Sequence, residues 1–297
     1  QFWVSICTAY STGFVGCALY CHNCMMKRIA VLLTVYNRRD KTLYCLDRLY
    51  HQENMDNYKV DVFLTDDGST DGTSEAVCTK YPKVHIIKGN GELYWNRGMY
   101  EAWKTAEKGD YDFYVWLNDD TFLFGNALSY LLECSHLLGG YCIVAGATCS
   151  KDNHEETTYS GFVRKRFIPV NGKFQKVQKF NGNFVLIPKS VFKVIGKNDP
   201  YYRHSFGDMD YGLRAGKVGI DCYITDKHIG TCEKHEYGMK CFDTHYSLFQ
   251  RFRAFYSPLG MNPCEFFHMN KQSLGLFHAI AVFITTHIRV FLPRLWK

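Results

Sequence analysis

VDVFLTDDGSTDG, residues 60–72, decides the fold of this chain of 297 residues. Its apolar first part ends directly in two adjacent carboxylates, Asp66 and Asp67, as a buried strand does when it reaches the edge of a sheet. Residues 113–120, FYVWLNDD, repeat this arrangement about fifty residues further on. In open α/β sheets, ligands bind at the carboxyl ends of parallel strands. Two acidic strand ends therefore predict a site for a divalent cation and a phosphorylated, polyhydroxylated ligand such as a nucleotide sugar.

Strand and helix patterns alternate through roughly the first 150 residues, which favours a doubly wound, mostly parallel sheet of the α/β class. The predicted strands cover residues 28–36, 60–66, 84–88, 113–118 and 142–148, and the predicted helices cover residues 41–51, 70–80, 97–107 and 127–138. Residues 150–183 are polar and contain turn signals. Beyond them we predict a strand at 184–188, a helix at 208–217, a strand at 220–225 and a helical pattern from 248 onward.

The C-terminal segment is apolar, aromatic and basic. Residues 274–292 lack charge until Arg289, and Arg294, Trp296 and Lys297 follow. The segment is shorter and more polar than a membrane-spanning helix. Two interpretations remain open, namely a helix that lies in a membrane interface and a helix docked on the core. We expect an extension at residues 1–25, an α/β domain at 26–245 and a C-terminal helical, membrane-associating segment at 246–297.

Composition excludes some classes of function. Hydrophobic residues make up 46% of the chain and charged residues 22%, as in ordinary globular proteins. The net charge of +6 is mild and comes with no block of Lys and Arg, so we expect no nucleic-acid partner. The excess of basic residues suits a diphosphate or an anionic membrane.

The 13 cysteines are scattered, odd in number and often inside apolar runs, which favours a reduced cytosolic protein. Cys17, Cys21 and Cys24 form a cluster that could instead bind a metal. The first 26 residues contain no charged side chain, so they could form a membrane anchor. Alternatively, Met26 is a natural start, and the preceding residues have no role in the fold.

Five motifs follow one another in a recognisable order. They are Thr34-Val35-Tyr36-Asn37, the stretch 66–72, Trp95-Asn96-Arg97-Gly98, Asn118-Asp119-Asp120, and Gly207-Asp208-Met209-Asp210 leading to Leu213-Arg214. Over about residues 28–240 the chain resembles the family 2 inverting glycosyltransferases, and is similar to bacterial surface-polysaccharide and rhamnosyltransferase-like enzymes. The resemblance implies the GT-A fold with a C-terminal helical extension.

The resemblance also implies which residues bind the donor. Asp66 and Asp67 correspond to carboxylates that accept hydrogen bonds from the nucleotide. A helix start at Asn96 and Arg97 suits a diphosphate or a nucleotide edge. Contacts with the sugar are expected from Trp95, Asn181 and Tyr202. The complete set of expected substrate-binding residues is Thr34, Tyr36, Asn37, Asp66, Asp67, Trp95, Asn96, Arg97, Asn118, Asp119 and Asn181.

A divalent cation, Mn²⁺ or Mg²⁺, is implied at the second acidic cluster. Asp120 matches the metal-binding position of the family, and oxygen-rich sites suit these ions. Asn118 stands where the family usually has Asp, so the site carries one negative charge fewer. Asp119 could then help to coordinate the metal. His235 is the expected histidine ligand, and His228 competes for this role.

The catalytic base is expected at the start of a late helix. Inverting transfer needs a carboxylate that takes a proton from the attacking hydroxyl. Asp208 aligns with the base of the family. Asp210 is either the base itself or a partner of it, and Arg214 is spaced to pair with Asp210.

The predicted function is metal-dependent transfer, with inversion, of a sugar from a nucleoside-diphosphate sugar to a hydroxyl of a glycan or lipid-linked acceptor in surface-polysaccharide synthesis. We expect a cytoplasmic hexosyl- or deoxyhexosyltransferase, peripheral at the inner face of the cell membrane. One alternative is a sugar nucleotidyltransferase, although the turn at residues 34–39 lacks the glycine-rich phosphate loop of that class. The other is a non-catalytic, nucleotide-binding scaffold of a glycan-assembly complex.

Overall fold

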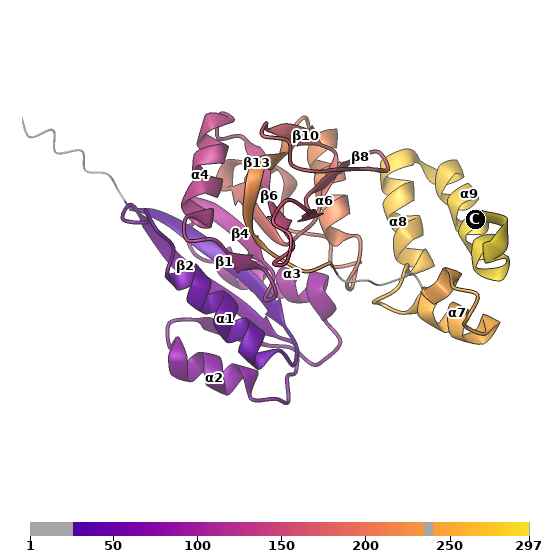
Figure 1. Ribbon diagram of the computed structural model, residues 1–297, viewed down its shortest axis with the longest axis horizontal. Coiled ribbons are helices and arrows are strands. Elements are labelled where there is room, and N and C mark those ends of the chain that lie inside the picture. The colour runs from indigo at the N-terminus through magenta and orange to yellow at the C-terminus, as the bar shows by residue number, and fades with distance from the viewer. Residues whose placement is uncertain (1–25, 235–239, 297) are drawn as a thin grey trace, which may run out of the picture.

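The computed structural model describes residues 26–234 and 240–296. An α/β unit lies on the left of Figure 1 and a group of C-terminal helices lies on the right. The α/β unit contains β1 (Lys27–Val35), α1 (Arg39–Tyr50), β2 (Tyr58–Asp66), α2 (Thr73–Lys80), β3 (His85–Lys88), α3 (Tyr94–Ala106), β4 (Phe113–Leu117), β5 (Phe122–Leu123), α4 (Ala127–Leu137), β6 (Cys142–Cys149), β7 (Thr157–Tyr159), β8 (Gly161–Val163), β9 (Arg166–Ile168), β10 (Gln175–Val177), β11 (Lys179–Phe180), β12 (Phe184–Pro188), α5 (Lys189–Ile195), α6 (Gly207–Lys217) and β13 (Asp221–Thr231). The C-terminal group contains η1 (Lys240–Phe242), α7 (Leu248–Tyr256), α8 (Pro263–Leu274), α9 (Leu276–Phe291) and η2 (Pro293–Trp296).

The central sheet has the strand order β10-β13-β6-β12-β4-β1-β2-β3. β1, β2, β3 and β4 run parallel, and Val35 at the end of β1 lies beside Asp66 at the end of β2. β12 runs antiparallel to both β4 and β6, so the sheet is mixed although mostly parallel. The predicted α/β class is confirmed. The parallel register brings the carboxyl ends of β1, β2 and β4 to one edge, which positions the site.

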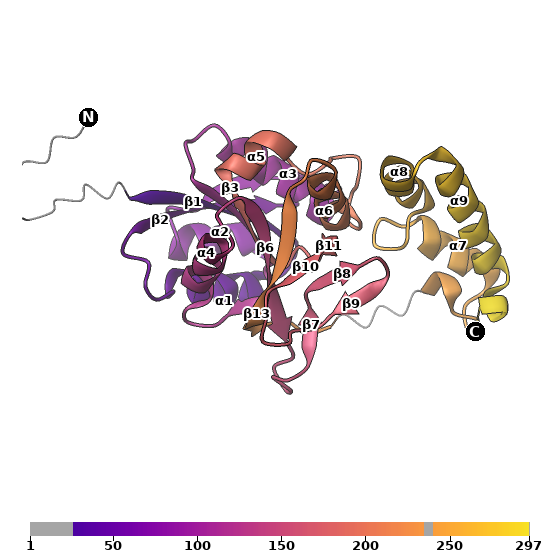
Figure 2. The same ribbon diagram turned by 90° about the horizontal axis from the view of Figure 1, so that it is seen from above.

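Helices cover both faces of the sheet, as Figure 2 shows from above. Side chains of β1 alternate between two hydrophobic clusters. Val31 packs with residues of α1, α2 and α4 on one face, whereas Leu32 packs with residues of α3, α5 and α6 on the other. A strand buried on both faces needs an almost continuous apolar sequence, which explains the run at 29–35.

The three largest differences from the predicted boundaries are at α2, α3 and β13. α2 begins at Thr73 rather than at residue 70, because Asp71 Oδ1 accepts hydrogen bonds from the Thr73 N–H and hydroxyl ahead of the helix. α3 begins at Tyr94, three residues earlier than predicted. β13 extends to Thr231, where it pairs with β5. Short strands β8, β9 and β11 form a second sheet within residues 150–183, and the sequence pattern gave no sign of it.

The C-terminal pattern is interrupted at Gly275, whose φ of +88° ends α8 before α9 begins. α9 has 16 residues, and none of the helices within residues 26–234 and 240–296 is long and apolar enough to cross a membrane. Residues 1–25, with the predicted anchor or extension and Cys17, Cys21 and Cys24, lie outside the described residues. The described cysteines are free, and Cys45, Cys134, Cys142, Cys149, Cys222, Cys232 and Cys241 are buried as small apolar groups.

Candidate active site

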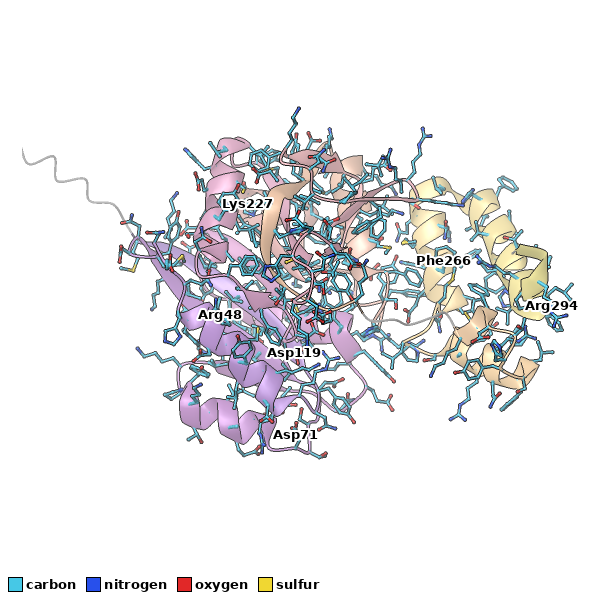
Figure 3. The ribbon with its side chains drawn as sticks, viewed as in Figure 1. Arg48, Asp71, Asp119, Lys227, Phe266 and Arg294 are labelled. Carbon is cyan, nitrogen blue, oxygen red and sulfur yellow. The ribbon has the colours of Figure 1, made fainter. Side chains whose placement is uncertain are left out.

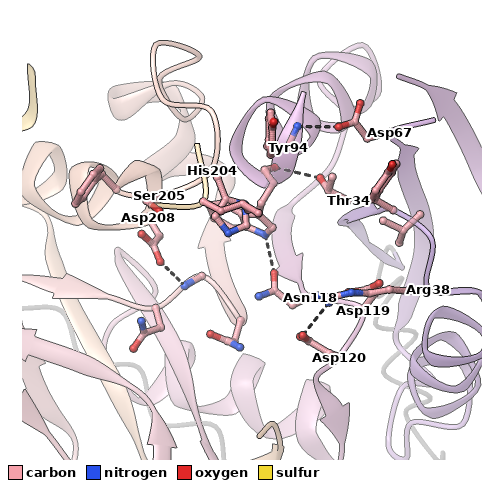
Figure 4. Close-up of a pocket in the computed structure, with 18 of the residues that line it drawn as sticks. Thr34, Arg38, Asp67, Tyr94, Asn118, Asp119, Asp120, His204, Ser205 and Asp208 are labelled. Atoms are coloured by element: carbon pink, nitrogen blue, oxygen red, sulfur yellow. Dashed lines mark hydrogen bonds and ion pairs between the residues drawn. The ribbon is translucent and has the colours of Figure 1, made fainter. Parts of the chain in front are cut away.

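A pocket of about 650 Å³ lies at the carboxyl ends of β1, β2 and β4. Segments far apart in the sequence form its walls, as the close-up in Figure 4 shows. The lining side chains include Thr34 near the end of β1, Tyr36 and Arg38 after β1, Asp67 after β2, Tyr94 and Trp95 of α3, Asn118, Asp119 and Asp120 after β4, Asn181 before β12, and Asp208 of α6. The two predicted acidic strand ends therefore meet at one cavity.

Asp67 ties the loop after β3 to the pocket. Its Oδ1 accepts the N–H groups of Gly91 at 2.9 Å and Leu93 at 3.2 Å, and its Oδ2 accepts the N–H of Tyr94 at 2.8 Å. A carboxylate has about four acceptor positions, so Asp67 retains capacity for one more donor. Asp66 instead accepts from the backbone of Ser69 and the hydroxyl of Ser74, and it does not line the pocket. Of the two predicted nucleotide-binding carboxylates, Asp67 is thus the one positioned for a ligand.

Trp95 connects β1 to the segment that follows β4 through two hydrogen bonds. Its indole N–H donates to Asn118 Oδ1 at 2.7 Å, and its carbonyl accepts from the hydroxyl of Thr34. A Cβ added at Gly182 would lie 2.6 Å from the Trp95 ring, so only glycine lets the 181–183 loop approach this closely. The indole N–H thus occupies one acceptor position of the Asn118 amide oxygen.

A single guanidinium nitrogen joins the acidic pair. Arg38 Nη1 lies 3.0 Å from Asp119 Oδ1 and 2.9 Å from Asp120 Oδ2. Burial raises the pKa of Asp119 to about 6, against the opposing attraction of Arg38. Thr42 also donates to Asp119. The space between the two carboxylates is therefore built to hold positive charge.

Asp208 lies across the pocket from Arg38 and the acidic pair (Figure 4), in the first turn of α6. Its Oδ2 accepts the N–H of Gly182 at 2.9 Å, and its Oδ1 accepts the N–H of Met209 at 2.7 Å. Burial raises the pKa of the Asp208 carboxyl to about 6, although these N–H groups favour the charged form. Such a carboxylate is ionised near neutral pH and still basic enough to accept a proton.

Asp210 has a different environment. Arg214 Nε donates to its Oδ2 at 2.9 Å, as the spacing predicts, and the hydroxyl of Tyr202 donates to its Oδ1 at 3.1 Å. Asp210 is buried and does not line the pocket. The geometry places Asp210 in a buried ion pair within α6, so its position does not support the alternative of Asp210 as the base.

Several predicted site residues support the pocket from outside it. Asn96 is fully buried and donates to the carbonyls of Asp199 and Tyr202, and Arg97 donates to the carbonyl of Pro200. The residues predicted to contact substrate that do not line the pocket are Asn37, Asp66, Asn96, Arg97 and Tyr202. Because loop 199–206 carries His204, Ser205 and Phe206 into the pocket, Asn96 acts on the site through that loop.

Neither predicted histidine ligand is among the described residues that line the pocket. His235 lies outside the described residues. His228 is hydrogen-bonded to Thr157 and does not line the pocket. Cys232, three residues before His235 in the sequence, lies with its Sγ 3.8 Å from Asp120 Oδ1. Within the described residues, no three His, Cys, Asp or Glu side chains form a group arranged for a metal.

The sequence pattern missed part of the site. Arg38 stands in the polar turn after β1, and only the pairing of β1 with β4 brings it to Asp119 and Asp120. Tyr94 and Phe206 line the pocket with φ of +56° and +72°. Positive φ is unfavourable for such side chains and is concentrated at functional sites. Leu259, from the loop between α7 and α8, also reaches the pocket.

The mostly parallel sheet with a pocket at the carboxyl ends of its strands is consistent with the GT-A fold. Residues 30–196, more than half of the chain, match the family described as Glycosyl transferase family 2, and the chain belongs to this family. Membership implies glycosyltransferase activity, with a nucleotide-sugar donor and an acceptor. A search of curated proteins finds no match.

Proposed function

We propose that the protein transfers a hexosyl or deoxyhexosyl group, with inversion and with the help of a divalent cation, from a nucleoside-diphosphate sugar to a hydroxyl of a glycan or lipid-linked acceptor in surface-polysaccharide synthesis. The observation that carries this proposal is one pocket with Arg38, Asp119 and Asp120 on one side and Asp208 on the other. One side suits the diphosphate and the other suits the attacking hydroxyl. We infer that the reaction takes place in the cytoplasm, at the inner face of the cell membrane.

The donor side has groups for each part of a nucleotide sugar. Asp67 can accept one more hydrogen bond from a base N–H or ribose hydroxyl. Arg38 is a planar cation suited to phosphate oxygens, and it already lies at the ends of β1 and β4. Trp95 offers a flat apolar surface beside Asn181 for the sugar ring.

A divalent cation fits the acidic pair. The two carboxylates already converge on one positively charged nitrogen, so a cation can be held between them by Asp120, with Asp119 and His235 as further candidate ligands. When bound, Mn²⁺ or Mg²⁺ would supply Lewis-acid stabilisation of charge on the departing diphosphate. Arg38 would then be free to turn from the carboxylates to the phosphate oxygens.

Asp208 is the base in this proposal. Its carboxylate would take the proton of the acceptor hydroxyl while that oxygen bonds to the anomeric carbon and the bond to the diphosphate breaks. The N–H of Gly182 holds the carboxylate in orientation. With a pKa of about 6, the base is ionised at pH 7, and the acceptor proton moves to a group of moderate basicity.

Nucleotide binding tests the class of function. The full chain is screened by thermal shift against UDP, dTDP, GDP and CMP, with and without Mn²⁺, next to the Asp120→Ala variant. One nucleotide at a hundred times its dissociation constant should add about 2.7 kcal/mol of stability. We expect this stabilisation to need Mn²⁺ and to be lost in Asp120→Ala, but to persist in the exposed control Asp40→Ala. Nucleotide binding with no turnover of any sugar donor would support the scaffold alternative, and pyrophosphate release from a nucleoside triphosphate would support the nucleotidyltransferase.

A further inference from the structure

α9 presents an apolar face that no described part of the chain covers. Phe277, Ile280, Ile284, Ile288 and Phe291 are all exposed, and the exposed fraction reaches 89% for Phe277 and 52% for Ile284. At about 100° per residue these five positions fall within an arc of about 80° on the helix. They form one continuous stripe, which we call the α9 stripe. Exposed apolar patches of this kind mark interaction surfaces.

The opposite face of the same helix is packed. Ala279 and Val290 are buried, and α9 lies against α8 and α7. Burial of this second face fixes the helix, so the stripe is held outward rather than left exposed by a loosely attached segment. A shallow, open depression lies beside the C-terminal half of the stripe, lined by Leu292 and by side chains of α9 such as Ile284, His287 and Ile288. Its apolar lining has the chemistry of an acyl-chain contact.

The charge of the C-terminal segment favours one occupant over the others. Residues 266–297 contain four basic and no acidic side chains. Lys271 on α8 and Arg294 just beyond α9 are exposed, and Figure 3 shows Arg294 at the outer edge of the molecule. A second copy of the chain would bring like charges together, whereas anionic lipid head groups would be complementary. We propose that the α9 stripe lies in the interface of an anionic membrane, parallel to its surface, with the basic side chains at the head groups.

The position of these helices connects the membrane to the pocket. On α8, Glu265 accepts from Arg203 Nε at 2.8 Å, and Phe266 stacks on Phe206 with ring centroids 5.2 Å apart. Phe206 and Leu259 line the pocket. Membrane binding through α9 would therefore hold the pocket near the lipid surface, which suits an acceptor on a lipid carrier. This last step rests on the proposed transferase function; the binding of α9 to lipid does not.

Vesicle flotation with the full chain tests the proposal. We expect binding to vesicles of phosphatidylcholine mixed with phosphatidylglycerol. The double variant Phe277→Ser, Ile284→Ser should bind about tenfold less or weaker still, because two apolar side chains no longer enter the interface. Leu137→Ser with Val194→Ser is the matched control, since these side chains are 63% and 51% exposed on α4 and α5 of the α/β unit. Equal binding of wild type and the α9 variant, or no binding at all, would overturn the proposal.

Two further measurements separate lipid from other occupants. Lys271→Gln with Arg294→Gln should weaken binding to the anionic vesicles severalfold and leave the weaker binding to pure phosphatidylcholine unchanged. Light scattering after gel filtration compares the oligomeric state of wild type and the α9 variant. A wild-type dimer that the variant dissociates, together with no flotation, would assign the stripe to a second copy and overturn the lipid proposal.

The same samples distinguish this proposal from the proposed function. The α9 variant keeps every residue of the pocket, so its stabilisation by nucleotide and Mn²⁺ should equal that of the wild type. Nucleotide binding without flotation would overturn the membrane proposal alone. Flotation without nucleotide binding would overturn the transferase proposal and leave the membrane contact standing.

Discussion

The α/β unit and the C-terminal helices solve the problem of burying apolar side chains in opposite ways. In the α/β unit, two clusters of more than twenty buried residues each fill both faces of the sheet. The C-terminal group has one small cluster, in which only Cys241, Phe255 and Val290 are buried. Meanwhile its helix α9 exposes a stripe of large apolar residues. The first unit has a complete core of its own, whereas the second keeps much of its apolar surface available for a partner.

This difference corresponds to a division of roles. The sheet can hold Asp67 and the ion pair of Arg38 with Asp120 in fixed positions, because its strands are packed on both sides. The C-terminal helices reach the site through Glu265 and Phe266, which contact the loop that carries Phe206. We expect substitutions in the first unit to change stability or chemistry and substitutions on α9 to change location.

The largest effect should come from the core of the sheet. Phe184 is fully buried in β12, so Phe184→Ala should lower the free energy of unfolding by about 3–5 kcal/mol through lost burial and a cavity. Phe277→Ala removes the same atoms from a side chain that is 89% exposed, so it should change the free energy of unfolding by less than about 0.5 kcal/mol. Urea denaturation measures both. A similar loss in the two variants would mean that α9 belongs to the core after all.

The next largest contrast in stability should lie between substitutions of the two carboxylates of α6. Asp210→Asn breaks a buried ion pair with Arg214, so we expect the free energy of unfolding to fall by about 2–4 kcal/mol. The loss is limited because Arg214 still donates hydrogen bonds to the carbonyls of Ile195 and Lys197. Asp208→Asn should cost less, because Asp208 accepts from two neutral backbone N–H groups, one of which the Asn oxygen can still satisfy. Thermal and urea unfolding measure the contrast. A greater loss for Asp208→Asn would reverse the assignment of the two residues.

A smaller effect is expected at the acidic pair. Arg38→Gln removes a cation that faces the donor side, so nucleoside-diphosphate affinity in the presence of Mn²⁺ should fall about tenfold. Arg39→Gln is the control, because Arg39 is half exposed and pairs with the exposed Asp40. Without nucleotide, Arg38→Gln should bind Mn²⁺ more tightly, since the carboxylates lose their competing partner. Titration calorimetry measures both affinities, and unchanged values would show that Arg38 serves only to hold Asp119 and Asp120.

The pH dependence gives the most gradual test. Asp208 must be unprotonated to act, so with a pKa of about 6 the transfer rate should halve near pH 6 and fall about tenfold for each further unit downward. Asp119, whose pKa is also raised to about 6, can steepen this limb, and the Asp119→Asn profile separates the two groups. A rate that stays constant down to pH 4.5 would mean that neither carboxyl titrates in the working enzyme.

The sequence was most informative where burial alone decides the structure. The runs ending at Asp66 and Leu117 are buried strands as predicted. Each of the twelve elements predicted between residues 28 and 225 begins or ends within one residue of the observed element, and β12 agrees at both ends. The mostly parallel α/β class followed from their alternation with helices. Asp67, Trp95, Asn118 and Asp208 were expected at the site and line one pocket.

What the sequence could not supply depends on tertiary pairing. β12 inserts antiparallel between β4 and β6, an order that no local pattern contains. Arg38 became a site residue only through the pairing of β1 with β4. Asn96 has the chemistry of a ligand-binding residue, but its amide is used to hold the loop at Asp199 and Tyr202. Residue type predicts capability, whereas the packing decides whether a side chain faces the pocket.

The most direct test of the central claim is the stereochemistry and rate of transfer. The sugar donor of the nucleotide that binds best is supplied with an acceptor, and NMR follows the anomeric configuration of the product for wild type and Asp208→Asn. We expect inversion by the wild type, and a rate in Asp208→Asn lower by about 10²–10⁴-fold with donor affinity unchanged. Retention of configuration, or equal rates in the two proteins, would contradict the assignment of Asp208 as the base of an inverting glycosyltransferase.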